Sequence, residues 1–257
     1  MKSLENLNIL ITRPKHQTQT LASKIQIEGG NPVSFPTLEI IALNKENILK
    51  QVRKIADYNF VIFISPNAVF KIVNYIHKIY QIWPNQTKTI AIGPGTVKAL
   101  KQHNLPIDYY PEKNFSSEGV LSLLPLQNPG QKNILIVKGQ GGSLTLPQTL
   151  KKRGAQIALL KVYKRSLPIH TITPEVKTID IIICTSNAGL TNLLSLLHPV
   201  WGDALFGKQL LVISSRIADY AKKLGFVKPL LISDNASDES ILQTLRTYTK
   251  LKVKSGH

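Results

Sequence analysis

The sequence predicts an α/β fold in which buried parallel strands alternate with helices. Short apolar runs rich in β-branched residues recur along the chain, as expected for strands covered on both faces. Helical periodicity follows them; for example, Val69, Ile72 and Ile76 share one face of a helix. This alternation is typical of parallel sheets. The expected strands are Ile9–Ile11, Phe60–Ile64, Thr89–Ile92, Ile134–Val137, Ile181–Cys184, Leu210–Ile213 and Leu230–Ile232.

An internal repeat indicates two copies of one unit. The apolar helix face that begins at Val69 is matched by one that begins at Leu190, 121 residues later. The same shift relates the apolar residues of Val120–Leu124 to those of Ile241–Leu245. A single shift in separated segments predicts a duplicated α/β unit. Two extended segments follow equivalent points of the copies and could carry the chain between them: Phe35–Leu43 and Leu159–Leu167.

The chain is strongly basic. It has 257 residues, with 32 Lys and Arg against 15 Asp and Glu, which gives a formal net charge of +17. Such a charge favours anionic partners: nucleic acid, a membrane surface or a multiply charged small molecule. The basic residues form small separate groups and aromatic residues make up 7%, unlike the basic stripe with stacking aromatics of a typical nucleic-acid binder. No apolar run approaches the roughly 20 residues of a membrane span. A small polyanion is therefore the favoured partner, and we expect the chain to bind neither nucleic acid nor a membrane.

Several kinds of site are not supported by the sequence. Cys184 is the single cysteine, so neither an intramolecular disulfide nor a Cys-rich zinc site can form, and the histidines lack metal-ligand spacing. Gly139–Gly142 does not match the dinucleotide-binding pattern, and Gly202–Lys208 precedes a predicted strand instead of following one. No metal or organic cofactor is expected. The first residues do not form a secretory signal, so the expected compartment is the cytoplasm.

The loops after the predicted strands are candidates for a binding site, because ligands of open parallel sheets bind beyond the carboxyl ends of the strands. These loops are small, hydroxyl-bearing or glycine-rich, and they lead into helices whose N-termini can hold an anion. Ser, Thr and Asn are also ordinary helix caps, so each loop has a purely structural alternative. The candidate substrate-binding residues are Thr12, Arg13, Ser65, Asn67, Gly93, Thr96, Lys138, Gly139, Thr185, Ser186, Ser214 and Arg216.

Taken together, the loops and their flanking segments make the sequence similar to the uroporphyrinogen-III synthase family. The segments that carry the resemblance, in the family's order, are Ile9–Pro14, Phe60–Val69, Ile90–Leu100, Ser117–Gly119, Val137–Gly142, Val162–Arg165, Ile181–Asn187 and Ser214–Phe226. The likeness covers about residues 7 to 245. The sequence departs from the family pattern at Lys138, where Arg is usual, at Ser143, where Arg is frequent, and at Ile217, where Thr is common.

The resemblance implies two flavodoxin-like parallel-sheet domains joined by a two-stranded linker, with the substrate cleft between them. One domain would be discontinuous and comprise residues 1–37 and 164–257. The other would be an inserted domain of the same type, residues 38–163. The segments Phe35–Leu43 and Leu159–Leu167 would form the linker.

The resemblance also implies a reaction. The substrate would be hydroxymethylbilane, a linear tetrapyrrole rich in carboxylates, which loses its hydroxyl as water. The chain then closes with inversion of the terminal pyrrole ring to give uroporphyrinogen III in heme biosynthesis, without a cofactor. Tyr163 matches the family's tyrosine and would donate a proton to the departing hydroxyl; its alternative role is packing at the domain junction. A phenol is protonated at neutral pH and can act as this acid.

Two other functions remain open from the sequence. A non-catalytic double α/β module that binds an anionic metabolite would share the same loops. A nucleic-acid-binding protein would explain the charge of +17. For the enzyme, nothing in the sequence requires more than a monomer, and a transient contact with hydroxymethylbilane synthase stays open.

Overall fold

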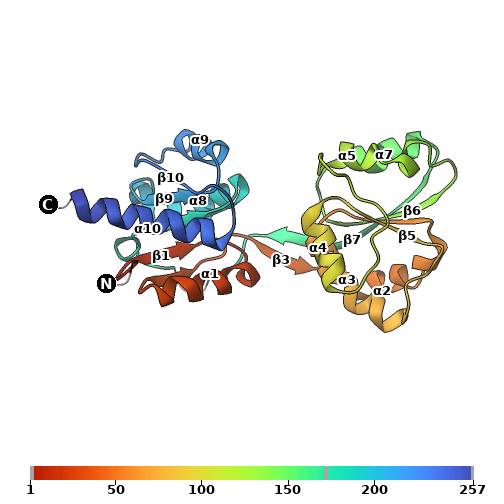
Figure 1. The fold of residues 1–257 in the computed structure, drawn as a ribbon, viewed down its shortest axis with the longest axis horizontal. Coiled ribbons are helices and arrows are strands. Elements are labelled where there is room, and N and C mark those ends of the chain that lie inside the picture. Colours follow the sequence, from red (N-terminus) through yellow and green to blue (C-terminus); the bar gives the residue numbers. More distant parts are fainter. Residues whose placement is uncertain (1–2, 171–172, 256–257) are drawn as a thin grey trace. The chain divides into compact units, whose positions relative to one another are not determined.

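The computed structural model describes residues 3–170 and 173–255, and it consists of two α/β units (Figure 1). Unit 1 comprises Met1–Glu39 with Ser166–His257, and unit 2 comprises Ile40–Arg165. Each unit has its own sheet, built largely of parallel strand pairs. The predicted fold class of two parallel-sheet α/β domains is thereby confirmed.

Unit 1 is built on a sheet in the order β10-β9-β8-β1-β2. Its strands are β1 (Asn8–Ile11), β2 (Asn31–Ser34), β8 (Ile181–Cys184), β9 (Gln209–Val212) and β10 (Leu231–Ile232). Its helices are α1 (Lys15–Ile27), α8 (Asn187–Trp201), α9 (Ser215–Lys223) and α10 (Asp238–Ser255).

The central strands β1, β8 and β9 of unit 1 are buried on both faces, which explains their mostly apolar sequence. Ile9 and Ile11 pack with residues of α1 and α10, whereas Leu10 packs with residues of α8 and α9. Successive side chains of a strand point to opposite faces, so one short strand serves two helical layers.

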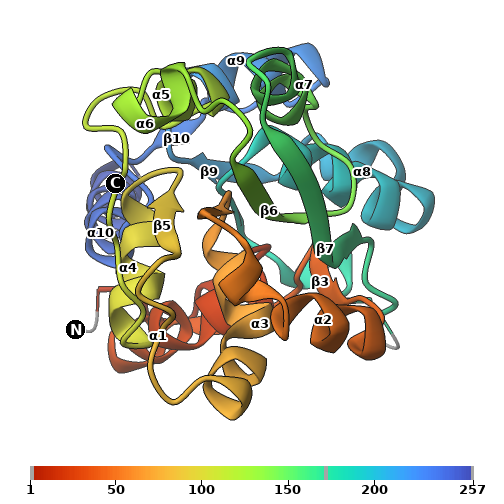
Figure 2. The ribbon, with the colours of Figure 1, turned by 90° about the vertical axis from the view of Figure 1, so that its right-hand side faces the viewer.

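Unit 2 is built on a sheet in the order β3-β7-β6-β4-β5. Its strands are β3 (Glu39–Ala42), β4 (Phe60–Phe63), β5 (Lys88–Ala91), β6 (Asn133–Gly139) and β7 (Gln156–Ser166). Its helices are α2 (Lys45–Val52), α3 (Pro66–Ile79), α4 (Pro94–Gln102), α5 (Ser117–Leu121), α6 (Leu124–Gln127) and α7 (Thr145–Lys152). Figure 2 shows α3 and α4 on one side of this sheet and α5 and α7 on the other.

The two sheets repeat one strand order. The order β2-β1-β8-β9 in unit 1 corresponds to β7-β6-β4-β5 in unit 2. Beyond β5, Tyr109 forms a parallel bridge with Ile90, at the position that β10 occupies beside β9. The predicted strands are all present, and β7 merges the strand that follows α7 with the second expected crossover. The chain passes between the units within β3 and within β7, which are neighbours in one sheet.

The parallel sheets determine where the candidate residues lie. Because parallel strands end at the same edge, the segments that follow β4, β5 and β6 meet at one edge of unit 2. The segments that follow β1, β8 and β9 meet in the same way in unit 1. Across residues 3–170 and 173–255, none of the helices combines the length and apolar character that crossing a membrane requires.

Candidate functional site

Tyr163 and Ser65 form a hydroxyl pair at the carboxyl edge of unit 2. Tyr163 lies in β7 and is 4% exposed, and its Oη is 3.0 Å from the Oγ of half-buried Ser65. Ser65 caps α3 by accepting a hydrogen bond of 3.1 Å from the backbone N–H of Ala68. Either hydroxyl of the pair can donate to the other. The two hydroxyls are therefore joined by one hydrogen bond at this edge.

Gly139 fixes the position of the Tyr163 ring. The two residues are paired between β6 and β7, and the backbone N–H of Gln140 donates to the carbonyl of Tyr163 at 2.7 Å. A Cβ atom added to Gly139 would come within 2.6 Å of the ring atoms Cε2 and Cζ of Tyr163. The ring thus lies directly on the glycine, and any larger residue would displace it.

Lys138 is a buried cation that directly precedes Gly139 in β6. Its side chain is 3% exposed, and its Nζ donates to the carbonyl of Ser143 at 3.3 Å. No carboxylate of residues 3–170 and 173–255 forms an ion pair with Lys138. Burial, together with the nearby charge of Lys161, lowers the pKa of Lys138. A buried ammonium without a counter-charge would gain from an anionic ligand.

The other predicted residues of unit 2 lie along the same edge. Gly93 begins α4 without a side-chain cap, and its carbonyl accepts from the backbone N–H of Thr96 at 3.0 Å. Thr96 is buried, and Asn67 lies half-buried in the first turn of α3. A Cβ atom on Gly95 would be 3.4 Å from the Cγ of Pro66, so the starts of α3 and α4 are neighbours.

The strand-end hydroxyls of unit 1 are used largely within the fold. The Thr12 hydroxyl donates to the carbonyl of Ile183 at 2.8 Å. Ser186 caps α8 by accepting from Gly189 at 2.9 Å, and Ser214 caps α9 by accepting from Ile217 at 3.4 Å. Capping, the structural alternative, thus accounts for both serines. Half-buried Thr185 precedes Ser186.

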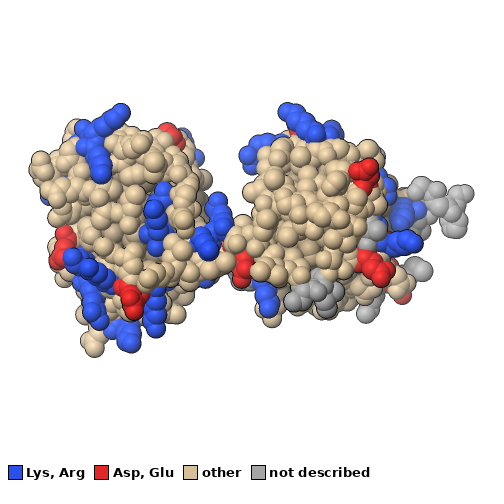
Figure 3. Space-filling model, turned by 180° about the vertical axis from the view of Figure 1, so that it is seen from behind, with Lys and Arg blue, Asp and Glu red and all other residues tan. Residues whose placement is uncertain are grey.

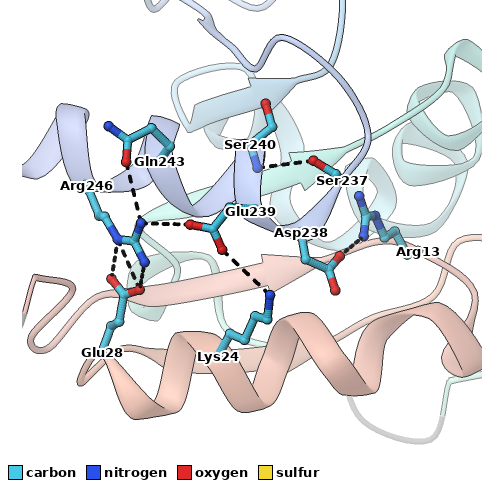
Figure 4. Close-up of polar contacts among 9 residues, drawn as sticks. All are labelled: Arg13, Lys24, Glu28, Ser237, Asp238, Glu239, Ser240, Gln243 and Arg246. Atoms are coloured by element: carbon cyan, nitrogen blue, oxygen red, sulfur yellow. Dashed lines mark hydrogen bonds and ion pairs between the residues drawn. The ribbon is translucent and has the colours of Figure 1, made fainter.

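Arg13 has an internal partner that the sequence did not suggest. It is 6% exposed, and its Nη1 donates to Asp238 Oδ1 at 2.6 Å, while Nη2 donates to the carbonyl of Ala236 (Figure 4). Asp238 is the first residue of α10. The charge of Arg13 is therefore balanced inside unit 1, and its predicted contact with the substrate stays a prediction.

A second ionic cluster holds α10 against α1 (Figure 4). Arg246 donates to both carboxylate oxygens of Glu28 and, at 3.0 Å, to Glu239. The Nζ of Lys24 lies 3.7 Å from Glu239. These contacts join the last helix of the chain to the first, so the pair of Arg13 and Asp238 belongs to a larger ionic interface.

Arg216 lies in the most open part of the unit 1 edge. It is exposed and lines a pocket of about 420 Å³ at the starts of α8 and α9, together with Asn187, Ser215, Asp219, Tyr220 and Lys223. The Oδ1 of Asn187 is buried and has no hydrogen-bond partner among the described residues. Two cations and a helix start in this pocket favour an anion, and the carboxylate of Asp219 opposes one.

The remaining positive charge is distributed. Figure 3 shows Lys and Arg spread over both units on the face drawn. In the described part of the chain, no group of three or more His, Cys, Asp and Glu is arranged to hold a metal ion.

Sequence reasoning missed three features of the site: the contact of Ser65 with Tyr163, the partner of Arg13, and the burial of Lys138. The first two join residues 98 and 225 positions apart. The available signal for the Arg13 pair was Asp238 at the start of α10. This signal is not specific, because acidic residues are common in the first turn of helices.

Sequence comparison gives consistent relatives. Residues 19–243 match the family described as "Uroporphyrinogen-III synthase HemD". The uroporphyrinogen-III synthase of Escherichia coli (strain K12) is 28% identical over 93% of this chain and 100% of its own length. That of Salmonella typhimurium is 29% identical with the same coverage.

Solved structures share the fold. A crystal structure of a mutant uroporphyrinogen III synthase from the extremely thermophilic bacterium Thermus thermophilus superposes with a TM-score of 0.63 at 17% identity, covering 96% of this chain and 99% of that one. The uroporphyrinogen-III synthetase of Helicobacter pylori 26695 gives a TM-score of 0.55 at 16% identity, covering 92% and 97%.

Proposed function

The chain belongs to the uroporphyrinogen-III synthase family, and we propose that it performs this family's reaction with the strand-end residues described above. It is a cyclising lyase of tetrapyrrole biosynthesis. It dehydrates hydroxymethylbilane and closes the macrocycle with inversion of the terminal ring, giving uroporphyrinogen III. The observation that supports its mechanism best is the hydroxyl pair of Tyr163 and Ser65, held in place by Gly139.

The pair supplies the proton for the departing hydroxyl. Of the two residues, Ser65 is the more exposed, so the proton reaches the substrate through its hydroxyl. Tyr163 donates to Ser65 Oγ, Ser65 donates its own proton to the leaving oxygen, and water leaves. The start of α3 and the serine hydroxyl together stabilise the resulting phenolate. The proton released when the new ring bond forms and aromaticity is restored returns to Tyr163.

We assign carboxylate binding to helix starts and to cations that form no ion pair within the described residues. In unit 2, Lys138 and the start of α4 are the proposed anchors. In unit 1, the pocket with Arg216 and Lys223 is the proposed anchor. Arg13 takes a positioning role instead, since Asp238 already balances it.

Orientation accounts for the product isomer. Loss of the hydroxyl leaves an electrophilic azafulvene, which the terminal ring attacks through its substituted carbon to form a spiro intermediate. Without guidance, closure occurs without inversion. Holding several carboxylates at once restricts the chain to the conformation that attacks with inversion, an effect of proximity and orientation. Water loss and ring closure are redox-neutral, so the reaction as proposed requires no redox cofactor.

The test of the function is the isomer formed in a coupled assay. The purified chain is added to a hydroxymethylbilane synthase that is converting porphobilinogen, and the uroporphyrinogens are oxidised and separated. The proposal expects type III to predominate, compared with type I when the chain is omitted. Type I alone in both reactions would refute the enzyme and favour a module that only binds the metabolite.

Three finer proposals accompany the function: that the enzyme acts as a monomer, in the cytoplasm, and that it meets hydroxymethylbilane synthase transiently. The transient contact is supported by the instability of the substrate. If the chain takes hydroxymethylbilane directly from hydroxymethylbilane synthase, less of it can close spontaneously to the type I isomer. Light scattering across a concentration series tests the monomer. Cell fractionation tests the compartment. The contact is tested by comparing the yield of type III when the two enzymes are mixed with the yield from preformed substrate. A contact predicts a higher yield in the mixture and a loss of this gain as the salt concentration rises.

A further inference from the structure

We infer that Phe115 contacts the face of a pyrrole ring of the substrate and contributes to substrate affinity. This inference rests on the proposed function, since it names a further contact for the same reaction. Phe115 is an aromatic residue with 50% of its side chain exposed. It lies in the segment before α5, outside the loops that sequence reasoning singled out.

Phe115 lies at the same sheet edge as the hydroxyl pair. A Cβ atom added to Gly93, which follows β5, would be 2.9 Å from the Cβ of Phe115. Two residues further, Gly95 adjoins Pro66, and Pro66 follows the Ser65 that bonds Tyr163. A continuous series of contacts therefore runs along the edge from the exposed aromatic ring to the proposed acid.

The backbone around Phe115 is held on both sides. Upstream, the carbonyl of Tyr109 accepts from the backbone N–H of Ala91 in β5 at 3.0 Å. Downstream, Ser116 caps α5 by accepting from the backbone N–H of Glu118 at 3.2 Å. The carbonyl of Asn114 lies so close to Gly119 that a Cβ atom there would be 1.7 Å from it. The backbone that carries the Phe115 ring is thus held in place, so ordering the ring when substrate binds costs little conformational entropy.

The chemistry of the substrate calls for such a residue. Helix starts, Lys138 and Arg216 suit carboxylates, but the faces of the pyrrole rings are apolar and gain from aromatic contact. In the order β7-β6-β4-β5, Ser65 follows β4, and Phe115 adjoins Gly93 at the end of the neighbouring strand β5. Phe115 is therefore placed to contact a pyrrole ring of a substrate whose hydroxyl leaves at Ser65.

The test is the KM for hydroxymethylbilane in Phe115→Ala, Phe115→Leu and Phe115→Tyr. The Ala variant should raise KM about 3- to 10-fold with little change in kcat, because a contact present in both ground and transition states is lost. Leu should fall between Ala and wild type, and Tyr should restore the wild-type KM. Phe70→Ala is the matched control: Phe70 is 40% exposed on α3 and contacts His103 edge-on, and its loss should leave KM unchanged.

Two results would overturn the inference while leaving the proposed function intact. One is a wild-type KM in Phe115→Ala. The other is an equal rise in KM in the Ala and Tyr variants that follows their loss of thermal stability, which would indicate a packing role. Absence of type III product from the wild-type enzyme would instead refute the proposed function itself.

Discussion

The carboxyl edges of the two sheets differ in how their polar groups are paired. In unit 1, Arg13 is balanced by Asp238, and the Thr12 hydroxyl donates to a backbone carbonyl. In unit 2, Lys138 has a carbonyl as its partner, and the hydroxyls of Tyr163 and Ser65 bond each other. One strand order therefore supports two kinds of edge. Much of the polarity of the first edge is used within the fold. The second edge has a hydrogen bond between two hydroxyls and a buried cation without an ion pair, so we propose that the proton chemistry takes place in unit 2.

The largest expected effect comes from Tyr163→Phe. Loss of the phenolic proton should lower kcat by about 10²–10⁴-fold, the usual contribution of acid catalysis, with the thermal midpoint close to wild type. Tyr80→Phe is the control, since the Tyr80 hydroxyl donates to the carbonyl of Arg53 and has no place in the proposed reaction. Wild-type turnover in Tyr163→Phe would remove the assignment and with it the contrast between the edges.

Gly139→Ala should come next. The added methyl would lie 2.6 Å from the Tyr163 ring, so the ring must move, and a displacement of about 1 Å costs roughly 10²-fold in rate. The strain should also destabilise unit 2 by about 1–3 kcal/mol in chemical denaturation. Gly207→Ala in unit 1 serves as control, because the nearest atom to its added methyl is 3.6 Å away. Equal behaviour of the two variants would show that the glycine does not position the ring.

Asp238→Asn tests the pairing in unit 1. It leaves the guanidinium of Arg13 buried without its counter-charge, which should cost about 2–3 kcal/mol of unfolding free energy. The exposed pair of Lys222 and Asp219, 4.0 Å apart, gives the comparison: Asp219→Asn should cost less than about 0.5 kcal/mol. If both variants lose equally little stability, Arg13 is not held by its ion pair, and its charge becomes available for a ligand.

Lys138→Met should have the smallest effect, with opposite signs on stability and binding. Burial lowers the pKa of Lys138 below its ordinary value of 10.5, so its charged form destabilises the fold at neutral pH. As the pH rises from the lowered pKa of Lys138 towards 10.5, the buried amine loses its proton and the free energy of unfolding increases. The variant should thus have a higher Tm at pH 7, and its stability should depend less on pH above neutrality. Its KM should rise through loss of a carboxylate contact.

Lys208→Met is the control that separates the effect of removing a partly buried lysine from the effect of removing an anion contact. Burial also lowers the pKa of Lys208, whose Nζ donates to the carbonyl of Ile179, but Lys208 lies before β9, away from the carboxyl edge. Kinetics at several salt concentrations should show a raised KM and a weaker salt dependence in Lys138→Met alone. An unchanged KM in Lys138→Met would contradict the role of Lys138 as an anion anchor.

The sequence predicts the fold well because the central strands are buried on both faces and their apolar runs are continuous. Ile181–Cys184 was located to the residue, and the loop that begins at Ser65 was identified from its position after β4. The pairings in the site were not predictable in the same way. The partner of Arg13 depends on where α10 docks, and the contact of Ser65 with Tyr163 depends on the strand order, neither of which local periodicity specifies.

The central claim is that Tyr163 and Ser65 act as one proton-transferring pair, and a double-mutant cycle on kcat tests it most directly. Tyr163→Phe, Ser65→Ala and the double variant are compared with wild type in single-turnover reactions with hydroxymethylbilane. Residues that act as a unit are strongly non-additive, so the double variant should be about as slow as either single variant. If instead the two losses multiply, or if Ser65→Ala turns over at the wild-type rate, the pair is not the proton donor.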